Sequence, residues 1–155
     1  MKTRWITCLT LLLSLSALIS PTVLADRGEQ KKVFGDYEVH YIGLTSSFLS
    51  PDVASAYAIE RSRKLGFLSI SVLNNPNDDV LPLPVTATIH GTIKNLIGQE
   101  SELEFKEIKE TNAVYYIATF RFDEEETYRI RLDVAPDGSD KHFDVRFSQR
   151  FYEED

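Results

Sequence analysis

Sulfur-containing residues and tryptophan are almost absent from this chain. Its 155 residues include one Cys, one Met and one Trp, and all three stand within the first eight positions. A chain with a single cysteine cannot close a disulfide on itself, so an apolar core has to hold the fold together. The same shortage excludes thiolate zinc centres and sulfur-ligated cuprous sites from every residue after Cys8.

Basic residues and catalytic motifs are also scarce. The chain has 17 Lys and Arg against 24 Asp and Glu, a formal net charge of −7, which disfavours a phosphate backbone or an anionic membrane as partner. We therefore expect no nucleic-acid partner. Neither Gly-x-Ser-x-Gly, Ser-x-x-Lys, a glycine-rich phosphate loop nor a cysteine nucleophile occurs after residue 25. The sequence thus predicts a protein that is not an enzyme and has no cofactor.

Residues 1–25 have the pattern of a secretory signal peptide. Lys2 and Arg4 form a basic start, Ile6–Ile19 form an apolar centre, and a small-residue cleavage site follows. At about 1.5 Å per residue the apolar centre spans roughly 21 Å of helix, short of the roughly 30 Å hydrocarbon layer of a bilayer. We therefore expect cleavage, no membrane insertion afterwards, and a single periplasmic domain at residues 26–155.

From residue 31 onward the apolar residues recur mainly at every second position, as in a strand with one buried face. The predicted buried rows are Tyr37, Val39 and Tyr41; Val85, Ala87, Ile89 and Ile93; Leu103 and Phe105; Val114, Tyr116, Ala118, Phe120 and Phe122; Tyr128, Ile130, Leu132 and Val134; and Phe143, Val145 and Phe147. This spacing predicts an all-β, immunoglobulin-like antiparallel β-sandwich of about 7–9 strands with no disulfide. A closed β-barrel satisfies the same alternation and remains an alternative.

A few segments are less regular. The nearly continuous apolar run Gly66–Leu73 predicts a central strand, and we expect a neighbouring strand at Ala56–Arg61. A Ser-Pro pair beginning at Ser50 predicts the start of one helical turn. Ile108 is out of phase with the apolar row before it, which indicates a β-bulge. Residues 26–32 are predicted to be a frayed polar lead.

The N-terminal half also resembles a known family. The residues that carry the resemblance are Phe34-Gly35-Asp36-Tyr37-Glu38-Val39-His40-Tyr41, Phe48-Leu49, Pro51, Val53-Ala54, Tyr57, Ile59 and Arg61-Ser62. They are similar to small exported bacterial proteins grouped as domain of unknown function 4426, and the later strands match more in pattern than in residue identity. The resemblance implies a single periplasmic immunoglobulin-like β-sandwich. It implies no activity, ligand or catalytic residue.

Three histidines are candidate metal ligands. His40, His90 and His142 all fall on the predicted outward phase of strands. If their strands were adjacent, the imidazoles could converge on a divalent metal ion. No two of them are close in sequence, however, so exposed or hydrogen-bonded structural histidines are the simpler interpretation.

The candidate interaction surface comprises Phe34, Asp36, His40, Phe48 and Arg61, around the first predicted strand and the loop that follows it. The alternative is that the aromatic residues of this region, Tyr37, Tyr41, Phe48 and Tyr57, belong to the core, with Arg61 paired to Asp36 or Glu38. Their period-two phase favours burial.

The leading functional hypothesis is a non-enzymatic protein-interaction module of the cell envelope. Such a protein would bind another envelope protein by sheet-edge addition or through a loop end of the sandwich. The alternative is a periplasmic protein that binds a metal or small ligand through the outward histidines, and a hydrolase is the third possibility. The sequence identifies neither the partner nor the oligomeric state.

Overall fold

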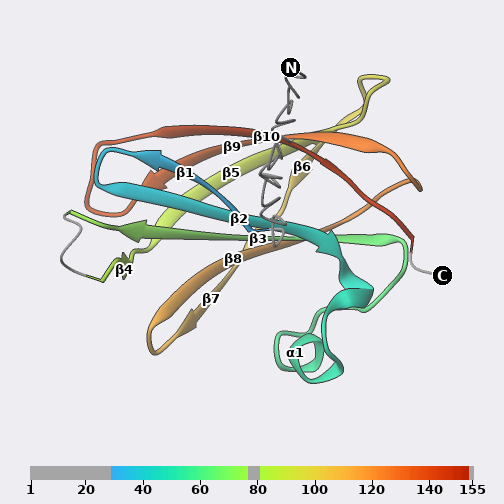
Figure 1. Cartoon of the computed structure of the whole chain (residues 1–155), viewed down its shortest axis with the longest axis horizontal. Coiled ribbons are helices and arrows are strands. Elements are labelled where there is room, and N and C mark those ends of the chain that lie inside the picture. The colour runs from blue at the N-terminus through green and yellow to red at the C-terminus, as the bar shows by residue number, and fades with distance from the viewer. Residues whose placement is uncertain (1–28, 77–80, 154–155) are drawn as a thin grey trace, which may run out of the picture.

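The computed structural model describes residues 29–76 and 81–153, so the predicted signal peptide at residues 1–25 lies outside the described residues. The described strands form two antiparallel sheets (Figure 1). Sheet A contains β1 (Glu29–Phe34), β2 (Tyr37–Thr45), β3 (Leu65–Asn74), β4 (Leu83–Pro84), β7 (Lys106–Glu110) and β8 (Ala113–Arg121). Its order is β1-β2-β3-β8-β7, with β4 paired to β3. Sheet B contains β5 (Ala87–Lys94), β6 (Glu100–Leu103), β9 (Thr127–Pro136) and β10 (Phe143–Arg150) in the order β10-β9-β5-β6.

The core lies between these two sheets. Along β9, Tyr128, Ile130, Leu132 and Val134 are buried, whereas the residues between them are exposed. The same alternation places Val39 and Tyr41 of β2, Ile70 and Val72 of β3, and Phe143 and Val145 of β10 in one continuous cluster. The predicted β-sandwich without a disulfide is therefore confirmed. The barrel alternative is wrong, because the described strands pair in two separate sheets.

Aromatic rings connect the two sheets along their length. Phe34 of β1 stacks on Phe143 of β10 with ring centroids 4.6 Å apart, and Tyr41 of β2 stacks on Phe147 of β10 at 4.1 Å. Phe151 is buried against the rings of Phe120, Phe122 and Tyr128. Each pair adds about 0.5–1.5 kcal/mol beyond its burial of apolar area. The rings thus supply cross-sheet contacts in a chain that cannot form a disulfide.

The central position predicted for Gly66–Leu73 is confirmed, because β3 lies between β2 and β8. Both of its faces are covered: Leu68 and Ile70 face the core, and Phe67, on the opposite face, is only 7% exposed. A Cβ at Gly66 would lie 2.4 Å from the Phe120 ring, so only glycine lets that ring pack on the strand.

The strand predicted at Ala56–Arg61 is wrong. Residues 51–56 form the helix α1 (Pro51–Ala56), and the Ser50 hydroxyl accepts a hydrogen bond from the Val53 amide at 3.3 Å, as the Ser-Pro pair predicts. After the helix the chain continues without strand structure to β3. In the described residues, no helix is long and apolar enough to cross a membrane.

The predictions of a frayed lead and of a β-bulge at Ile108 are also wrong, because each considered one segment without the strand or sheet that it joins. Residues 29–32, predicted as a polar lead, belong to β1, where Lys31 lies opposite His40 of β2. A polar sequence can form a strand at a sheet edge because only the side of the strand that faces its neighbour needs hydrogen-bond partners from the sheet.

Ile108 marks no bulge. The chain leaves sheet B at Leu103 and enters sheet A at Lys106, so the phase of its buried residues changes. With the short β4, the structure describes ten strands against the seven to nine expected.

A strained residue ends α1. Ala58 has φ +54°, in the left-handed region, and the Ile59 and Ala58 amides donate to the carbonyls of Ala54 and Ser55 at 2.8 and 3.3 Å. These two bonds form a Schellman motif, in which glycine is the usual residue at the position of Ala58.

We expect Ala58→Gly to raise the free energy of unfolding by about 0.5–1 kcal/mol, because it removes the clash of a Cβ in the left-handed region. The matched control is Ala56→Gly at the last residue of α1, which should lower the free energy of unfolding by about 0.5–1 kcal/mol. Urea denaturation of both variants measures the difference. Destabilisation of equal size in both would contradict this explanation.

Candidate functional site

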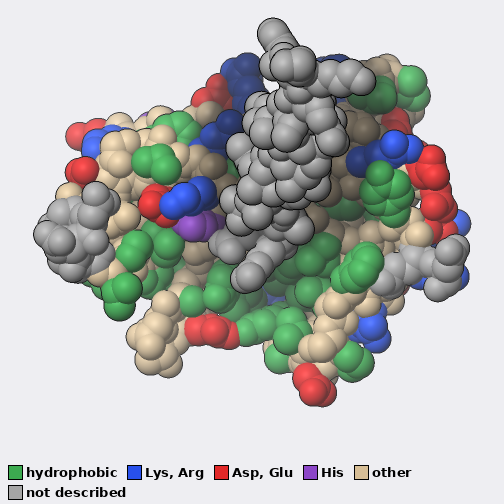
Figure 2. Space-filling view, viewed as in Figure 1, with side chains coloured by type: hydrophobic (Ala, Val, Ile, Leu, Met, Phe, Trp, Pro, Cys, Tyr) green, Lys and Arg blue, Asp and Glu red, His purple; other side chains and the backbone are tan. Residues whose placement is uncertain are grey.

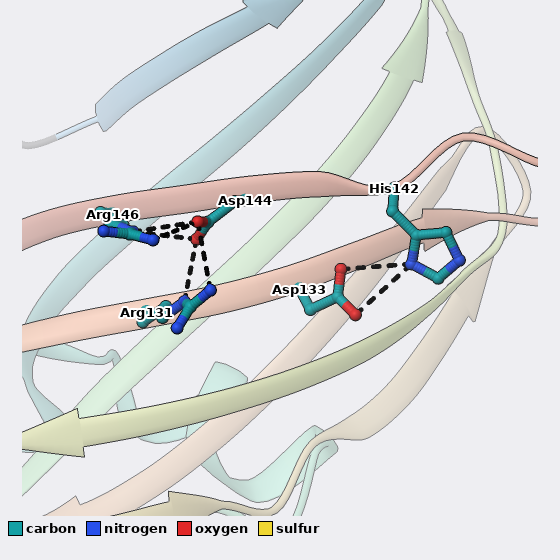
Figure 3. A network of polar contacts seen from close by, with 5 residues as sticks. All are labelled: Arg131, Asp133, His142, Asp144 and Arg146. Carbon is teal, nitrogen blue, oxygen red and sulfur yellow. Dashed lines mark hydrogen bonds and ion pairs between the residues drawn. The ribbon is translucent and has the colours of Figure 1, made fainter.

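The structure brings two of the three predicted histidines together and separates the third. His90 on β5 lies directly opposite Asp133 of β9, and His142 Nδ1 lies 3.3 Å from Asp133 Oδ1 (Figure 3). His40 lies on the outer face of sheet A, on the other side of the core. The three imidazoles therefore cannot converge on one metal ion. In the part of the chain that the structure describes, no three His, Cys, Asp or Glu side chains are already arranged to hold a metal.

His90 and His142 line a groove of about 900 Å³ over the outer face of sheet B. Its surface consists of cross-strand rows, since residues opposite one another in register face the same side. Three of these rows are His90, Asp133 and Asp144; Thr92, Arg131 and Arg146; and Lys94, Arg129 and Ser148. On the β6 side, Glu100 and Glu102 complete the lining. The groove therefore carries charges of both signs, and Leu103, Ile130 and Phe147 add apolar surface to its lining.

Asp144 holds two arginines of the groove in place (Figure 3). The Nε and Nη2 atoms of Arg131 donate to its two carboxylate oxygens at 3.0 and 3.3 Å, and Arg146 Nε donates to the same oxygens at 3.1 and 3.0 Å. The hydrogen bonds from Arg146, and then those from Arg131, lower the pKa of Asp144 to about 2. Arg131 and Arg146 lie directly opposite each other, a like-charged pair that would repel without this shared carboxylate.

A second polar cluster lies on the outer face of sheet A. Glu38 accepts hydrogen bonds from His40 Nε2 at 2.8 Å, Lys31 Nζ at 3.1 Å and Asn75 Nδ2 at 3.3 Å. Its side chain is only 12% exposed. The bond from His40, followed by that from Lys31, lowers the pKa of Glu38 to about 2. This cluster fastens β1 to β2 and the end of β3, so its evident role is structural.

The predicted interaction surface is divided between two regions. Phe34, the last residue of β1, packs against the core, and Asp36 lies in the β1–β2 turn, where its carbonyl accepts a hydrogen bond from the Asn75 amide. Phe48 lies beyond the far end of β2, in the short helix η1 (Ser46–Phe48), and Arg61 donates to the nearby Ser47 carbonyl at 2.7 Å. The nine residues of β2 separate the two regions by roughly 30 Å.

The structure also tests the core alternative for this region. Tyr41 is buried and Tyr37 packs against the core, as that interpretation predicts. For Phe48 it is wrong, because this ring is 64% exposed. The predicted pairing of Arg61 with Asp36 or Glu38 is also wrong, because Arg61 binds a backbone carbonyl instead.

An apolar hollow of about 250 Å³ lies between α1 and the outer face of sheet A. Figure 2 shows hydrophobic side chains gathered beside α1 and over β8. Phe67 and Ile117 of the sheet and Val53 of the helix line this hollow. Tyr57 closes one side, where its hydroxyl donates to Glu110 and its carbonyl accepts from Lys106. The residues around α1 thus cover part of sheet A, while the corresponding face of sheet B carries the polar groove.

Comparison with known proteins identifies the family. The model of domain of unknown function 4426 (DUF4426) matches residues 31–154. The chain belongs to the DUF4426 family. The crystal structure of a DUF4426 protein from Pseudomonas aeruginosa has 32% sequence identity and a TM-score of 0.71, and the match covers 84% of this chain and 99% of that one. A search of curated protein sequences found no match.

Two more distant structures share the fold of this DUF4426 protein. FetP of uropathogenic E. coli, produced in the periplasm, has 13% identity and a TM-score of 0.58 over 83% of this chain and 96% of its own. A copper-bound variant of P19 from Campylobacter jejuni has 13% identity and a TM-score of 0.53 over 79% and 94%. At this identity the likeness shows the fold alone.

The sequence did not predict the most ordered part of the groove of this DUF4426 protein. Arg129, Arg131 and Arg146 stand between members of the buried rows predicted for β9 and β10, but the alternation gave no reason to connect these arginines. The signal was present in principle, because arginines in the outward phase of two strands joined by a turn must share one face. Only the register shows that Asp144 lies between two of them.

The Glu38 cluster predicts an acid-dependent loss of stability. Because folding lowers the pKa of Glu38 from 4.5 to about 2, its contribution is complete above pH 4.5 and is lost as the pH falls toward 2. We expect Glu38→Gln to destabilise the protein by about 1–3 kcal/mol at neutral pH and by much less near pH 2.5. Urea denaturation across this pH range measures the free energy of unfolding, and Glu104→Gln, at an exposed position, is the control. If the destabilisation caused by Glu38→Gln were the same at every pH, ionised Glu38 would not be the source of the stability.

Proposed function

We propose that this DUF4426 protein is a non-enzymatic binding module of the bacterial periplasm, and that the groove over sheet B holds a segment of another envelope protein. The observation that carries the proposal is the ordered charged surface of this groove. Arg131 and Arg146 are both hydrogen-bonded to Asp144 there, so they lose less side-chain entropy when a partner binds than unpaired arginines would. The signal-peptide pattern of residues 1–25 supports export.

The electrostatics of the groove favour binding over catalysis. A general acid at neutral pH needs a carboxyl group with a raised pKa. In the groove the pKa values of two carboxyl groups shift downward instead: the arginines lower the pKa of Asp144, and Lys94 lowers that of Glu100. These carboxylates remain ionised and serve as fixed charges.

The shape of the surface favours a protein segment as ligand. The groove crosses all four strands of sheet B, and it is wide and open enough for an extended chain with several side chains. Its rows carry charges of both signs, which select a partner by charge complementarity. The proposed surface is therefore a sheet face, whereas the sequence suggested a sheet edge or a loop end.

Site-specific photocrosslinking in living cells tests this proposal. A photoreactive residue at Thr92, in the middle of the groove, should give a discrete crosslinked product, and Arg129→Glu should abolish it. The matched control is Thr119, which is exposed on the outer face of sheet A. Identical products from both positions, or none from Thr92, would overturn the proposal.

A divalent metal ion is a second candidate ligand, favoured by the position of His90 and His142 on either side of Asp133. Two imidazoles and a carboxylate are donors that suit copper(II) or zinc. The copper-bound state of P19 shows that a protein of this fold can bind copper. No three ligands of the described residues are preformed around one point, so these exposed side chains would have to reorient.

Calorimetric titration with copper(II) and zinc tests the metal hypothesis. The metal hypothesis predicts one binding site. His90→Ala and His142→Ala should each lower its metal affinity at least tenfold, whereas His40→Ala, on the opposite sheet, should leave the affinity unchanged. Equal weakening by His40→Ala, or the absence of stoichiometric binding, would exclude a metal site at Asp133.

A further inference from the structure

Three arginines gather on the β9–β10 side of the groove. Arg131 lies opposite Arg146, and Arg129, two residues earlier on β9, lies between Lys94 and Ser148 in register. All three arginine side chains line the groove, and their residues are exposed. This concentration of positive charge stands out because the whole chain carries a net charge of −7.

The carboxylates on this side do not balance the three guanidinium groups. Asp144 is shared by Arg131 and Arg146. Glu100 is paired with Lys94, and Asp133 is in contact with His142. Within residues 29–76 and 81–153, no ion pair or hydrogen bond of the Arg129 side chain is observed. The β9–β10 side of the groove is therefore locally cationic, whereas on the β6 side Glu100 is paired with Lys94 and Glu102 adds a further negative charge.

The two paired arginines keep part of their hydrogen-bonding capacity. Each donates to Asp144 through Nε and Nη2, which leaves the Nη1 group outside these bonds (Figure 3). A guanidinium group carries five N–H donors in a planar fork that matches a carboxylate. Because Asp144 already orients both forks, a second carboxylate can bind with little additional ordering.

We propose that the groove recognises an acidic segment of its protein partner, with carboxylates placed against Arg129 and against the Nη1 edges of Arg131 and Arg146. This inference rests on the proposed function of the groove. The spacing of the arginines supports an extended segment. Side chains two residues apart on one face of a strand are about 6.5–7 Å apart, and this spacing applies both to Arg129 and Arg131 on β9 and to alternate residues of an extended partner. The Glu100 and Glu102 carboxylates on the β6 side oppose a continuous polyanion such as a nucleic acid.

Fluorescence anisotropy with a labelled peptide of alternating Thr and Glu tests the inference. We expect the purified protein to bind this peptide, and to bind the corresponding Thr-Gln peptide at least tenfold more weakly. Arg129→Gln should weaken binding of the acidic peptide at least fivefold. Arg121→Gln removes the same charge from the outer face of sheet A and should leave binding within twofold. Circular dichroism verifies that both variants keep the β fold.

Four results would overturn the inference. The first is equal weakening by Arg121→Gln and Arg129→Gln, which indicates a long-range charge effect. The second is equal binding of the Thr-Glu and Thr-Gln peptides. The third is displacement of the peptide by inorganic phosphate but not by acetate, which assigns the arginines to a phosphate ligand. A crosslink from Thr92 that persists without acidic-peptide binding would reject this inference and leave the proposed function standing.

Discussion

Burial of alternate side chains between two sheets, with no disulfide between them, is the constraint on which the rest of this structure depends. Each long strand contributes one apolar row to a shared core, and rings from opposite sheets meet there in the Phe34–Phe143 and Tyr41–Phe147 stacks. Because pleated strands alternate with a period of two, a slip of one residue in register would move a whole row into water. The hydrophobic effect thus holds the sheets together and also determines their register.

The groove follows from the same constraint. Once Tyr128, Ile130, Leu132 and Val134 of β9 face the core, the residues between them must face outward. The register then brings Arg131 opposite Arg146 and Asp133 opposite both His90 and Asp144. Asp144 relieves the repulsion between the two arginines, so the charged surface is ordered by its own ion pairs. Sheet A differs because the residues around α1 cover part of its outer face, which leaves an apolar hollow there.

Local sequence patterns predicted well wherever one strand face is buried. The alternation of Tyr128–Val134 and the continuous apolar run of β3 both have a direct physical cause, since burial on one or two faces selects residue types locally. Patterns failed where the cause is distant. β1 is polar and is a strand only because β2 lies beside it, and the phase change at Ile108 reflects a change of sheet. For Ala56–Arg61, the apolar pattern was short and ambiguous, and the chain forms the Schellman motif after α1 instead of a strand.

The candidate site shows the same division. The sequence alone determined the absence of a disulfide, the family resemblance, the all-β class and the outward phase of His40, His90 and the β9 arginines, because composition and period are properties of the chain itself. His142, which was also predicted on a strand, lies immediately before β10. Only the tertiary structure decided that His90 and His142 meet at Asp133 while His40 lies beyond the core, and that Asp144 joins Arg131 to Arg146. The physical reason is that strand order and register arise from pairing between segments far apart in sequence. Neither leaves a signature in any one segment.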